Sequence, residues 1–147
     1  MHALKYGGHA AYAEIFAAAL APLPGPRPDG LVPLPLAPAR QRERGFNQAG
    51  EIARHLGRRL GVPVWPALAR TRDTTPQAAL PWDARAANVR GAFAATRALA
   101  GMRVAVVDDV MTTGATLDAA ARAALAAGAV AVEAWVGART LPPDSLS

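Results

Sequence analysis

Apolar residues recur along the chain at helical spacing in three segments. Over residues 9–20 they return every three or four positions, which predicts an amphipathic helix that ends at the prolines that follow. A second stripe predicts a helix between Asn47, which can cap its start, and Gly61, which can stop it. A third stripe predicts a helix over residues 117–125 that stops at a glycine.

Shorter apolar runs alternate with these helices and predict strands. They cover residues 31–35, 62–68, 104–107 and 130–136. The first run contains Pro33 and Pro35, which donate no backbone hydrogen bond, so it predicts an edge strand or one that ends at once in a loop. Residues 104–107 are apolar at every position, as in a strand that is buried on both faces. This alternation predicts right-handed crossovers and a parallel sheet covered by helices.

One long segment has no regular pattern. Residues 70–91 hold several arginines, and a loop of that length in a compact domain is usually a lid, a binding element or disordered. The whole chain of 147 residues fits one domain. We therefore predict an α/β fold with one parallel sheet, a single domain over residues 1–140 and a flexible tail over residues 141–147.

The composition excludes some classes of function without choosing among the rest. The chain has no cysteine, which excludes disulfides, thiolate zinc sites and a thiol nucleophile. No apolar run approaches the ~20 residues that cross a bilayer, and the first residues lack the pattern of a signal peptide. These features predict a cytoplasmic protein without membrane insertion. The net charge of +5 favours an anionic partner, whether nucleic acid, a membrane surface or a phosphorylated small molecule.

Candidate chemistry lies where the apolar run gives way to Asp108 and Asp109. In open α/β sheets ligands bind beyond the carboxyl ends of the strands. The following loop leads into a helix, so its backbone N–H groups and the positive end of the helix dipole meet at one point. The loop adds three threonine hydroxyls, and a glycine that lets the backbone approach a ligand. Its residues are Met111, Thr112, Thr113, Gly114, Ala115 and Thr116. This pattern predicts a cup for a phosphate group.

A phosphate cup beside two carboxylates indicates a ligand with a phosphate at one end and vicinal hydroxyls at the other, such as a ribose 5-phosphate. For Asp108 and Asp109 to converge, the chain must leave the sheet there, because side chains alternate along a strand. One carboxylate could instead orient its neighbour or a Mg²⁺-bound water, and Asp109 with the threonines could simply cap the helix. Other nucleotide sites fit worse, because Lys5 is the only lysine and no G-x-G-x-x-G follows a strand.

The string from Val106 to Thr116 resembles the phosphoribosyl pyrophosphate motif of type I phosphoribosyltransferases. Further segments are similar to the ComF subgroup, competence-linked proteins with this fold, and the similarity runs from about Leu4 to Arg139. These segments are residues 32–35, 40–49, 72–77 and 88–93. ComF relatives often begin with a cysteine zinc module, which this cysteine-free chain lacks. The resemblance implies a Rossmann-like fold with a small hood and a flexible loop.

The resemblance also implies roles for particular residues. Asp108 and Asp109 would hold the ribose hydroxyls, and residues 112–116 the 5-phosphate. The pyrophosphate would bind to the loop formed by Pro33, Leu34, Pro35 and Leu36. The segment 70–91 would be the flexible catalytic loop, while the N-terminal helix and part of the arginine-rich region would border the acceptor site.

The implied reaction is the displacement of pyrophosphate from C1 of the ribose by a nitrogenous base, whose identity stays open. The catalytic residues would be Asp108, Asp109, Arg72 and Arg90, with Arg85 as a further candidate for closing over the pyrophosphate. Positioning and electrostatic stabilisation can supply most of such a barrier. Mg²⁺ would arrive mainly with phosphoribosyl pyrophosphate, so no protein metal ligand is assigned. Relatives of this fold are commonly dimers, which implies a homodimer.

Two other classes of function stay open. In the first, a non-catalytic accessory of DNA uptake senses a ribose-phosphate metabolite, and its arginines contact single-stranded DNA or DNA-uptake proteins. These arginines are Arg40, Arg42, Arg44, Arg54, Arg58 and Arg59. Such binding should weaken steeply with salt and usually adds aromatic stacking. The second is a regulator that binds phosphoribosyl pyrophosphate as an effector, but no helix-turn-helix is evident.

Overall fold

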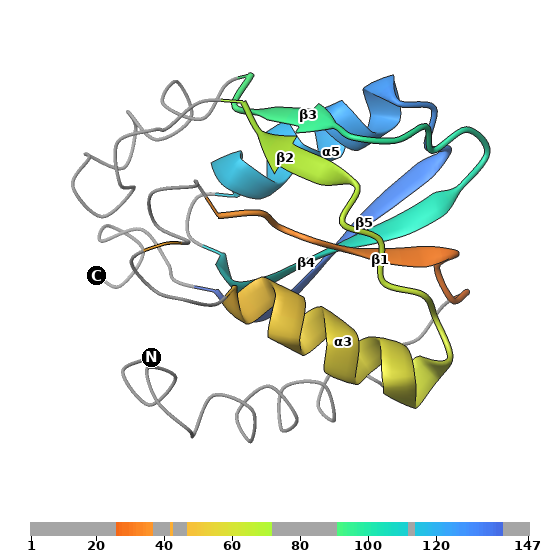
Figure 1. Cartoon of the computed structure of the whole chain (residues 1–147), viewed down its shortest axis with the longest axis vertical. Coiled ribbons are helices and arrows are strands. Elements are labelled where there is room, and N and C mark those ends of the chain that lie inside the picture. The colour runs from red at the N-terminus through yellow and green to blue at the C-terminus, as the bar shows by residue number, and fades with distance from the viewer. Residues whose placement is uncertain (1–25, 37–41, 43–46, 72–90, 112–113, 140–147) are drawn as a thin grey trace, which may run out of the picture.

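A parallel sheet runs through the centre of the computed structural model (Figure 1). Within the described residues it has three strands in the order β1-β4-β5, namely β1 (Gly30–Pro33), β4 (Arg103–Met111) and β5 (Ala131–Arg139). A second sheet pairs β2 (Leu68–Arg70) and β3 (Phe93–Ala95) in the antiparallel sense. The structure describes residues 26–36, 42, 47–71, 91–111 and 114–139.

The register of the parallel sheet brings the carboxyl ends of its strands to one edge. Val107 of β4 lies opposite Pro33 at the end of β1, and Met111 lies opposite Arg139 at the end of β5. β1 lies at the side of this sheet, with one isolated parallel bridge from Leu31 to Val64 on its other flank. Within the described residues β1 is the outer strand of this sheet and it ends at Pro33, which agrees with the prediction of an edge strand or of one that ends at once in a loop.

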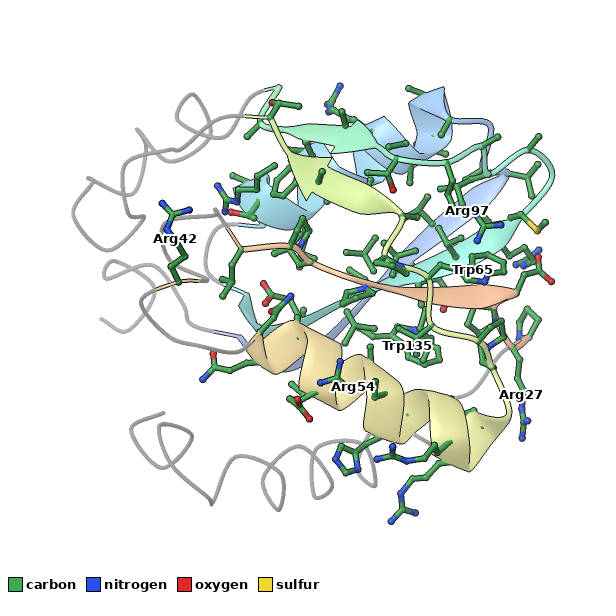
Figure 2. All side chains as sticks on the ribbon, in the orientation of Figure 1. Arg27, Arg42, Arg54, Trp65, Arg97 and Trp135 are labelled. Atoms are coloured by element: carbon green, nitrogen blue, oxygen red, sulfur yellow. The ribbon has the colours of Figure 1, made fainter. Side chains whose placement is uncertain are left out.

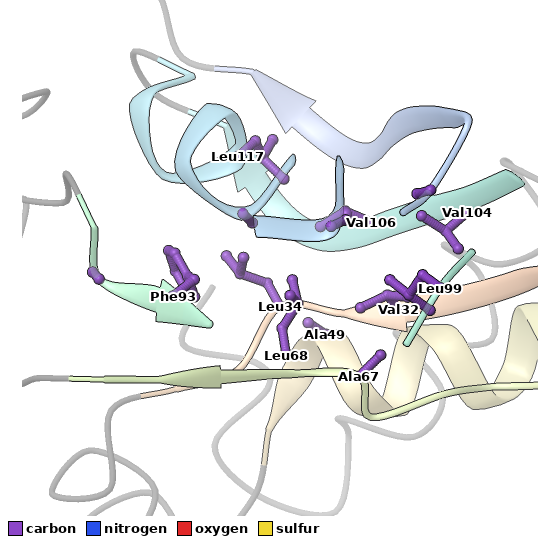
Figure 3. Packing of buried hydrophobic residues seen from close by; sticks show 14 residues of the cluster. Val32, Leu34, Ala49, Ala67, Leu68, Phe93, Leu99, Val104, Val106 and Leu117 are labelled. Carbon is purple, nitrogen blue, oxygen red and sulfur yellow. The ribbon is translucent and has the colours of Figure 1, made fainter. Parts of the chain in front are cut away.

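The two faces of β4 are covered by different elements (Figure 1). On one face Ala105 and Val107 pack with helix α3 (Gln48–Leu60), whose apolar stripe supplies Ile52, Ala53, Leu56 and Leu60. On the other face Val104 and Val106 pack with helix α5 (Ala115–Ala126) and with the β2-β3 pair (Figure 3). Residues 104–107 are at most 1% exposed, which confirms a strand buried on both faces.

The helix ends follow from local sequence. Asn47 is extended, with φ −110°, and its side chain accepts a hydrogen bond from the N–H of Ala49. Gly61 ends α3 in the left-handed region with φ 67°, and its N–H donates to the carbonyl of Gly57. These contacts confirm the predicted cap and stop of this helix.

Two strand predictions need correction. Residues 62–68 do not form a strand: Val64 makes a single bridge, and β2 starts only at Leu68. Pro63 and Pro66 explain this break, because each removes a backbone donor from a ladder. The prediction missed β3, since its three residues are too few to show a period. The helix predicted over residues 9–20 and the tail over 141–147 lie outside the described residues, so the proposed domain bounds stay predictions.

No helix in the described part of the chain is long and apolar enough to cross a membrane.

The two glycines inside α3 should respond oppositely to alanine. A Cβ on Gly57 would lie 2.7 Å from the carbonyl oxygen of Val62, whereas a Cβ on Gly50 would have nothing closer than 3.7 Å. Gly57→Ala should lower the free energy of unfolding by about 1–3 kcal/mol through this clash. Gly50→Ala should raise it by about 0.5–1 kcal/mol, because alanine loses less conformational entropy in a helix.

Urea denaturation followed by circular dichroism would measure both changes. Equal effects of the two substitutions would contradict the packing of Gly57 against the turn that follows α3.

Candidate functional site

The candidate site lies at the edge where β1 and β4 end and where α3 and α5 begin (Figure 1). β2 and β3 also reach this edge, because Arg70 at the end of β2 lies opposite Phe93 and its Nε–H donates to the Pro35 carbonyl. Six described elements thus converge at the carboxyl ends of the parallel strands, the position at which open α/β sheets bind ligands.

Asp108 lies inside β4, opposite Val136 of β5, and is half-buried. Side-chain alternation places it on the same face as Val104 and Val106, the face that α5 covers. The expectation that the chain leaves the sheet at Asp108 and Asp109 is wrong. β4 continues to Met111 because β5 extends equally far and pairs with it. The side chains of residues 109–111 lie outside the described part of the structure.

α5 begins at a glycine in a left-handed conformation. Gly114 has φ 84° and ψ −3°, a conformation that glycine adopts without the steric cost that a side chain would bring. A glycine has no side chain with which to cap the first turn, and the positive end of the helix dipole lies there. Gly114, Ala115 and Thr116 are half-buried beside the end of β4, while Thr112 and Thr113 lie outside the described residues.

An exposed ion pair lies on the outer side of α5. Arg122 donates a hydrogen bond of 2.9 Å to Asp118 in the first turn. This hydrogen bond and the carboxylate charge raise the pKa of the Arg122 guanidinium. Arg122 partly neutralises the charge of the Asp118 carboxylate near the start of the helix. The ion pair contributes little to the stability of the fold because both groups face solvent.

The loop after β1 lies against the end of β4. The N–H of Leu34 donates to the carbonyl of Val107 over 2.9 Å, and the Leu34 side chain is buried in the core. The loop is therefore held so that only its backbone and the half-buried residues Pro33, Pro35 and Leu36 can contribute to a site. The structure thus brings the predicted pyrophosphate loop close to the strand that carries Asp108.

Two residues at this edge had no predicted catalytic or binding role. The Asn47 side-chain amide donates to the Leu34 carbonyl over 3.1 Å, in addition to capping α3. The Arg70 guanidinium lies 5.0 Å from the centre of the Phe93 ring, beside the same loop. Neither contact could be found without the β2-β3 pairing and the packing of α3. Arg72, Arg85 and Arg90, which were singled out instead, lie outside the described residues.

Four of the six arginines proposed to bind DNA are exposed, and two of these four contact neighbouring side chains. Arg42, Arg54, Arg58 and Arg59 are exposed, while Arg40 and Arg44 lie outside the described residues. Arg54 forms an ion pair with Glu51, and an Arg58 nitrogen lies 3.1 Å from His55 Nδ1.

The described aromatic side chains provide no open stacking surface. Phe93 and Trp135 are buried. The Trp65 ring packs against Gly30, where a Cβ would lie 2.2 Å from the ring, and it lies beneath Arg97 at 4.7 Å (Figure 2). Trp65 is half-buried and already contacts Gly30 and Arg97, so none of the three described aromatic side chains is fully exposed, as stacking on single-stranded DNA favours.

No cluster of three or more histidine, aspartate or glutamate side chains that could hold a metal ion occurs among the described residues. Asp108 is a carboxylate oxygen donor of the type that Mg²⁺ accepts, and Mg²⁺ commonly combines one or two carboxylates with phosphate oxygens of a substrate. The described edge therefore fits a metal ion that is carried by a phosphorylated ligand.

Residues 42–140 match the family model of the phosphoribosyl transferase domain. The chain belongs to this phosphoribosyl transferase family. The sequence is 39% identical over 116 residues to DNA utilization protein YhgH of Escherichia coli K12, which covers 78% of this chain and 51% of YhgH. It is 34% identical over 116 residues to competence protein F of Haemophilus influenzae, with 76% and 51% covered.

These relatives confirm that the protein is a ComF-like phosphoribosyl transferase-family member. Competence protein ComFC of Bacillus subtilis is 37% identical over 101 residues, which cover 69% of this chain and 40% of ComFC. The chain spans about half the length of YhgH and competence protein F. The phosphoribosyl transferase fold itself is confirmed by a solved structure, glutamine phosphoribosylpyrophosphate amidotransferase from B. subtilis. Its TM-score is 0.61 at 22% identity, with 88% of this chain and 26% of that chain covered.

Proposed function

We propose that this chain binds phosphoribosyl pyrophosphate at the carboxyl edge of its sheet and transfers the phosphoribosyl group to a nitrogenous base. One observation carries the proposal: Asp108, the glycine-led start of α5 and the loop after β1 all lie at this edge. They offer a carboxylate, a helix N-terminus and a backbone loop, which match the hydroxyls, the phosphate and the diphosphate of one ligand. Membership of the phosphoribosyl transferase family supports this match.

Each part of the ligand has a proposed partner. Asp108 and Asp109 accept hydrogen bonds from the ribose 2- and 3-hydroxyls, since ionised carboxylates are strong acceptors. Residues 112–116 bind the 5-phosphate through helix N–H groups and threonine hydroxyls. Residues 33–36 bind the pyrophosphate through their backbone. Met111 closes β4 and directs the chain into the phosphate cup.

In the proposed reaction the bond from C1 of the ribose to the pyrophosphate oxygen breaks, and a bond from C1 to a nitrogen of the base forms. Both electrons of the broken bond leave with the pyrophosphate, and the proton that the base loses passes to solvent water. Asp108 and Asp109 hold the ribose, while Arg72 and Arg90 supply positive charge to the leaving group. Mg²⁺ bound to the diphosphate would neutralise part of its charge.

The proposal extends to the oligomeric state, the compartment and the biological context of the protein. We expect a homodimer that works in the cytoplasm on a base still to be identified. The names of the relatives favour a context of DNA utilisation or competence. They also support a second candidate, a non-catalytic accessory that binds DNA through its exposed arginines and senses a ribose-phosphate metabolite.

The carboxylates should be essential for binding. Calorimetric titration of phosphoribosyl pyrophosphate with Mg²⁺ into the native protein should show saturable binding, and the double variant Asp108→Asn, Asp109→Asn should lose affinity by about a hundredfold or more. Hydrogen bonds to charged groups contribute about 1.5–3 kcal/mol each, which accounts for this loss.

Asp29→Asn is the matched control, because Asp29 lies at the opposite edge, where its carboxylate accepts from the N–H of Arg103. It should bind like the native protein. If folded native protein does not bind the ligand, the proposal fails and DNA binding becomes the first candidate.

The left-handed glycine should matter for affinity as well as for stability. Gly114→Ala forces a side chain into a positive φ at a cost of roughly 1–2 kcal/mol, and relief of this strain should displace the first amides of α5. We expect about a tenfold loss of affinity for ribose 5-phosphate, measured by calorimetry.

Gly101→Ala is the control, because Gly101 has φ 75° and open space around it, before the start of β4 at the other edge. It should lower stability comparably but leave affinity unchanged. Equal affinity of the two variants for ribose 5-phosphate would contradict the proposal that the start of α5 binds the 5-phosphate.

A further inference from the structure

Two consecutive carbonyl groups of the loop after β1 are held by side chains from other elements. The Leu34 carbonyl accepts a hydrogen bond from Asn47 Nδ2 over 3.1 Å, and the Pro35 carbonyl accepts one from Arg70 Nε over 3.4 Å. The donors come from the start of α3 and the end of β2, which lie 13 and 35 residues away in the sequence. The loop is therefore clamped between two parts of the fold.

The contacts of Asn47 exceed what a helix cap requires. Its Oδ1 accepts from the N–H of Ala49 over 3.2 Å, which is the capping contact, while Nδ2 reaches Leu34. Serine and aspartate cap helices about as well as asparagine does. Aspartate has no donor when ionised, and the shorter serine side chain does not extend to the position of Nδ2. The choice of asparagine is explained by the second contact.

The Arg70 contact sets the direction of a backbone N–H. Pro35 has no N–H, so the next donor in the loop is the N–H of Leu36. A trans peptide unit is planar, and its N–H points away from its carbonyl. A hydrogen bond that fixes the Pro35 carbonyl therefore also fixes the Leu36 N–H on the opposite side. This N–H makes no backbone hydrogen bond to the described residues.

We propose that Asn47 and Arg70 are positioning residues for the diphosphate group of the substrate. By holding the carbonyls of Leu34 and Pro35, they keep these negative ends of the peptide dipoles away from the ligand and direct the Leu36 N–H toward it. The guanidinium of Arg70, which lies over the Phe93 ring, also places a positive charge beside the loop. The inference rests on the proposed function, because it assigns the loop to the diphosphate.

The test compares two ligands that differ only in the diphosphate. Phosphoribosyl pyrophosphate and ribose 5-phosphate, both in the presence of Mg²⁺, are each titrated calorimetrically into the native protein and the Asn47→Ser variant. We expect the variant to bind phosphoribosyl pyrophosphate about tenfold more weakly and ribose 5-phosphate within twofold of the native protein. A purely structural role of Asn47 would weaken both ligands together.

Asn47→Ala separates the effect of the helix cap from the effect of the hydrogen bond to the Leu34 carbonyl. It removes both contacts, so its urea midpoint should fall below that of Asn47→Ser, whereas its affinity for phosphoribosyl pyrophosphate should equal that of the serine variant. Affinity would then follow the contact to Leu34, and stability would follow the cap.

Arg70→Lys tests the second contact while keeping the charge. Lysine lacks the Nε–H geometry of arginine, so the variant should lose severalfold in affinity for phosphoribosyl pyrophosphate alone. Native affinity in Arg70→Lys and in Asn47→Ser, or a parallel loss for both ligands, would overturn the inference while leaving the proposed function intact. A native protein that binds neither ligand would overturn both.

Discussion

Complete burial of the central strand is the constraint on which the rest of the structure depends. Residues 104–107 are at most 1% exposed, so apolar side chains must cover them on both sides. α3 covers one face, and α5 with the β2-β3 pair covers the other. Because the strands are parallel, each connection must return across the sheet, and both helices begin at the edge where β1 and β4 end. The core therefore determines which elements meet at the edge that carries the candidate site.

The same constraint divides the polar chemistry between two edges. No polar or charged side chain is buried within the described part of the chain. At the amino edge Asp29 accepts from the N–H of Arg103, and Arg97 covers Trp65, so these groups stabilise the fold. At the carboxyl edge Asn47 and Arg70 hold the loop after β1, while Asp108 lies near the end of β4 on the face that α5 covers. These polar groups lie at the edge because strands cannot carry them inside a core that is apolar on both faces.

Local patterns predicted the elements that local interactions determine. Asn47 and Gly61 could be recognised as the ends of α3 because capping depends on nearby residues. The length of β4 could not be predicted, since its continuation to Met111 depends on pairing with β5. β3 and the role of Arg70 were missed for the same reason, because both depend on contacts between residues far apart in the sequence. The edge that carries the candidate site could be predicted from the sequence, but the residues that hold the loop after β1 could not.

The prolines of the loop after β1 explain why distant side chains are needed there. Pro33 at the end of β1 and Pro35 in the loop restrict φ, but they also remove N–H groups, so this part of the chain cannot complete a ladder of its own. A carbonyl left beside a diphosphate would repel it, and a buried carbonyl without a donor is costly. Donors from α3 and β2 solve both problems, because they satisfy the carbonyls and orient the peptide unit that follows. The packing of α3 against the sheet is thereby linked to the geometry of the proposed diphosphate site, since one residue caps the helix and holds the loop.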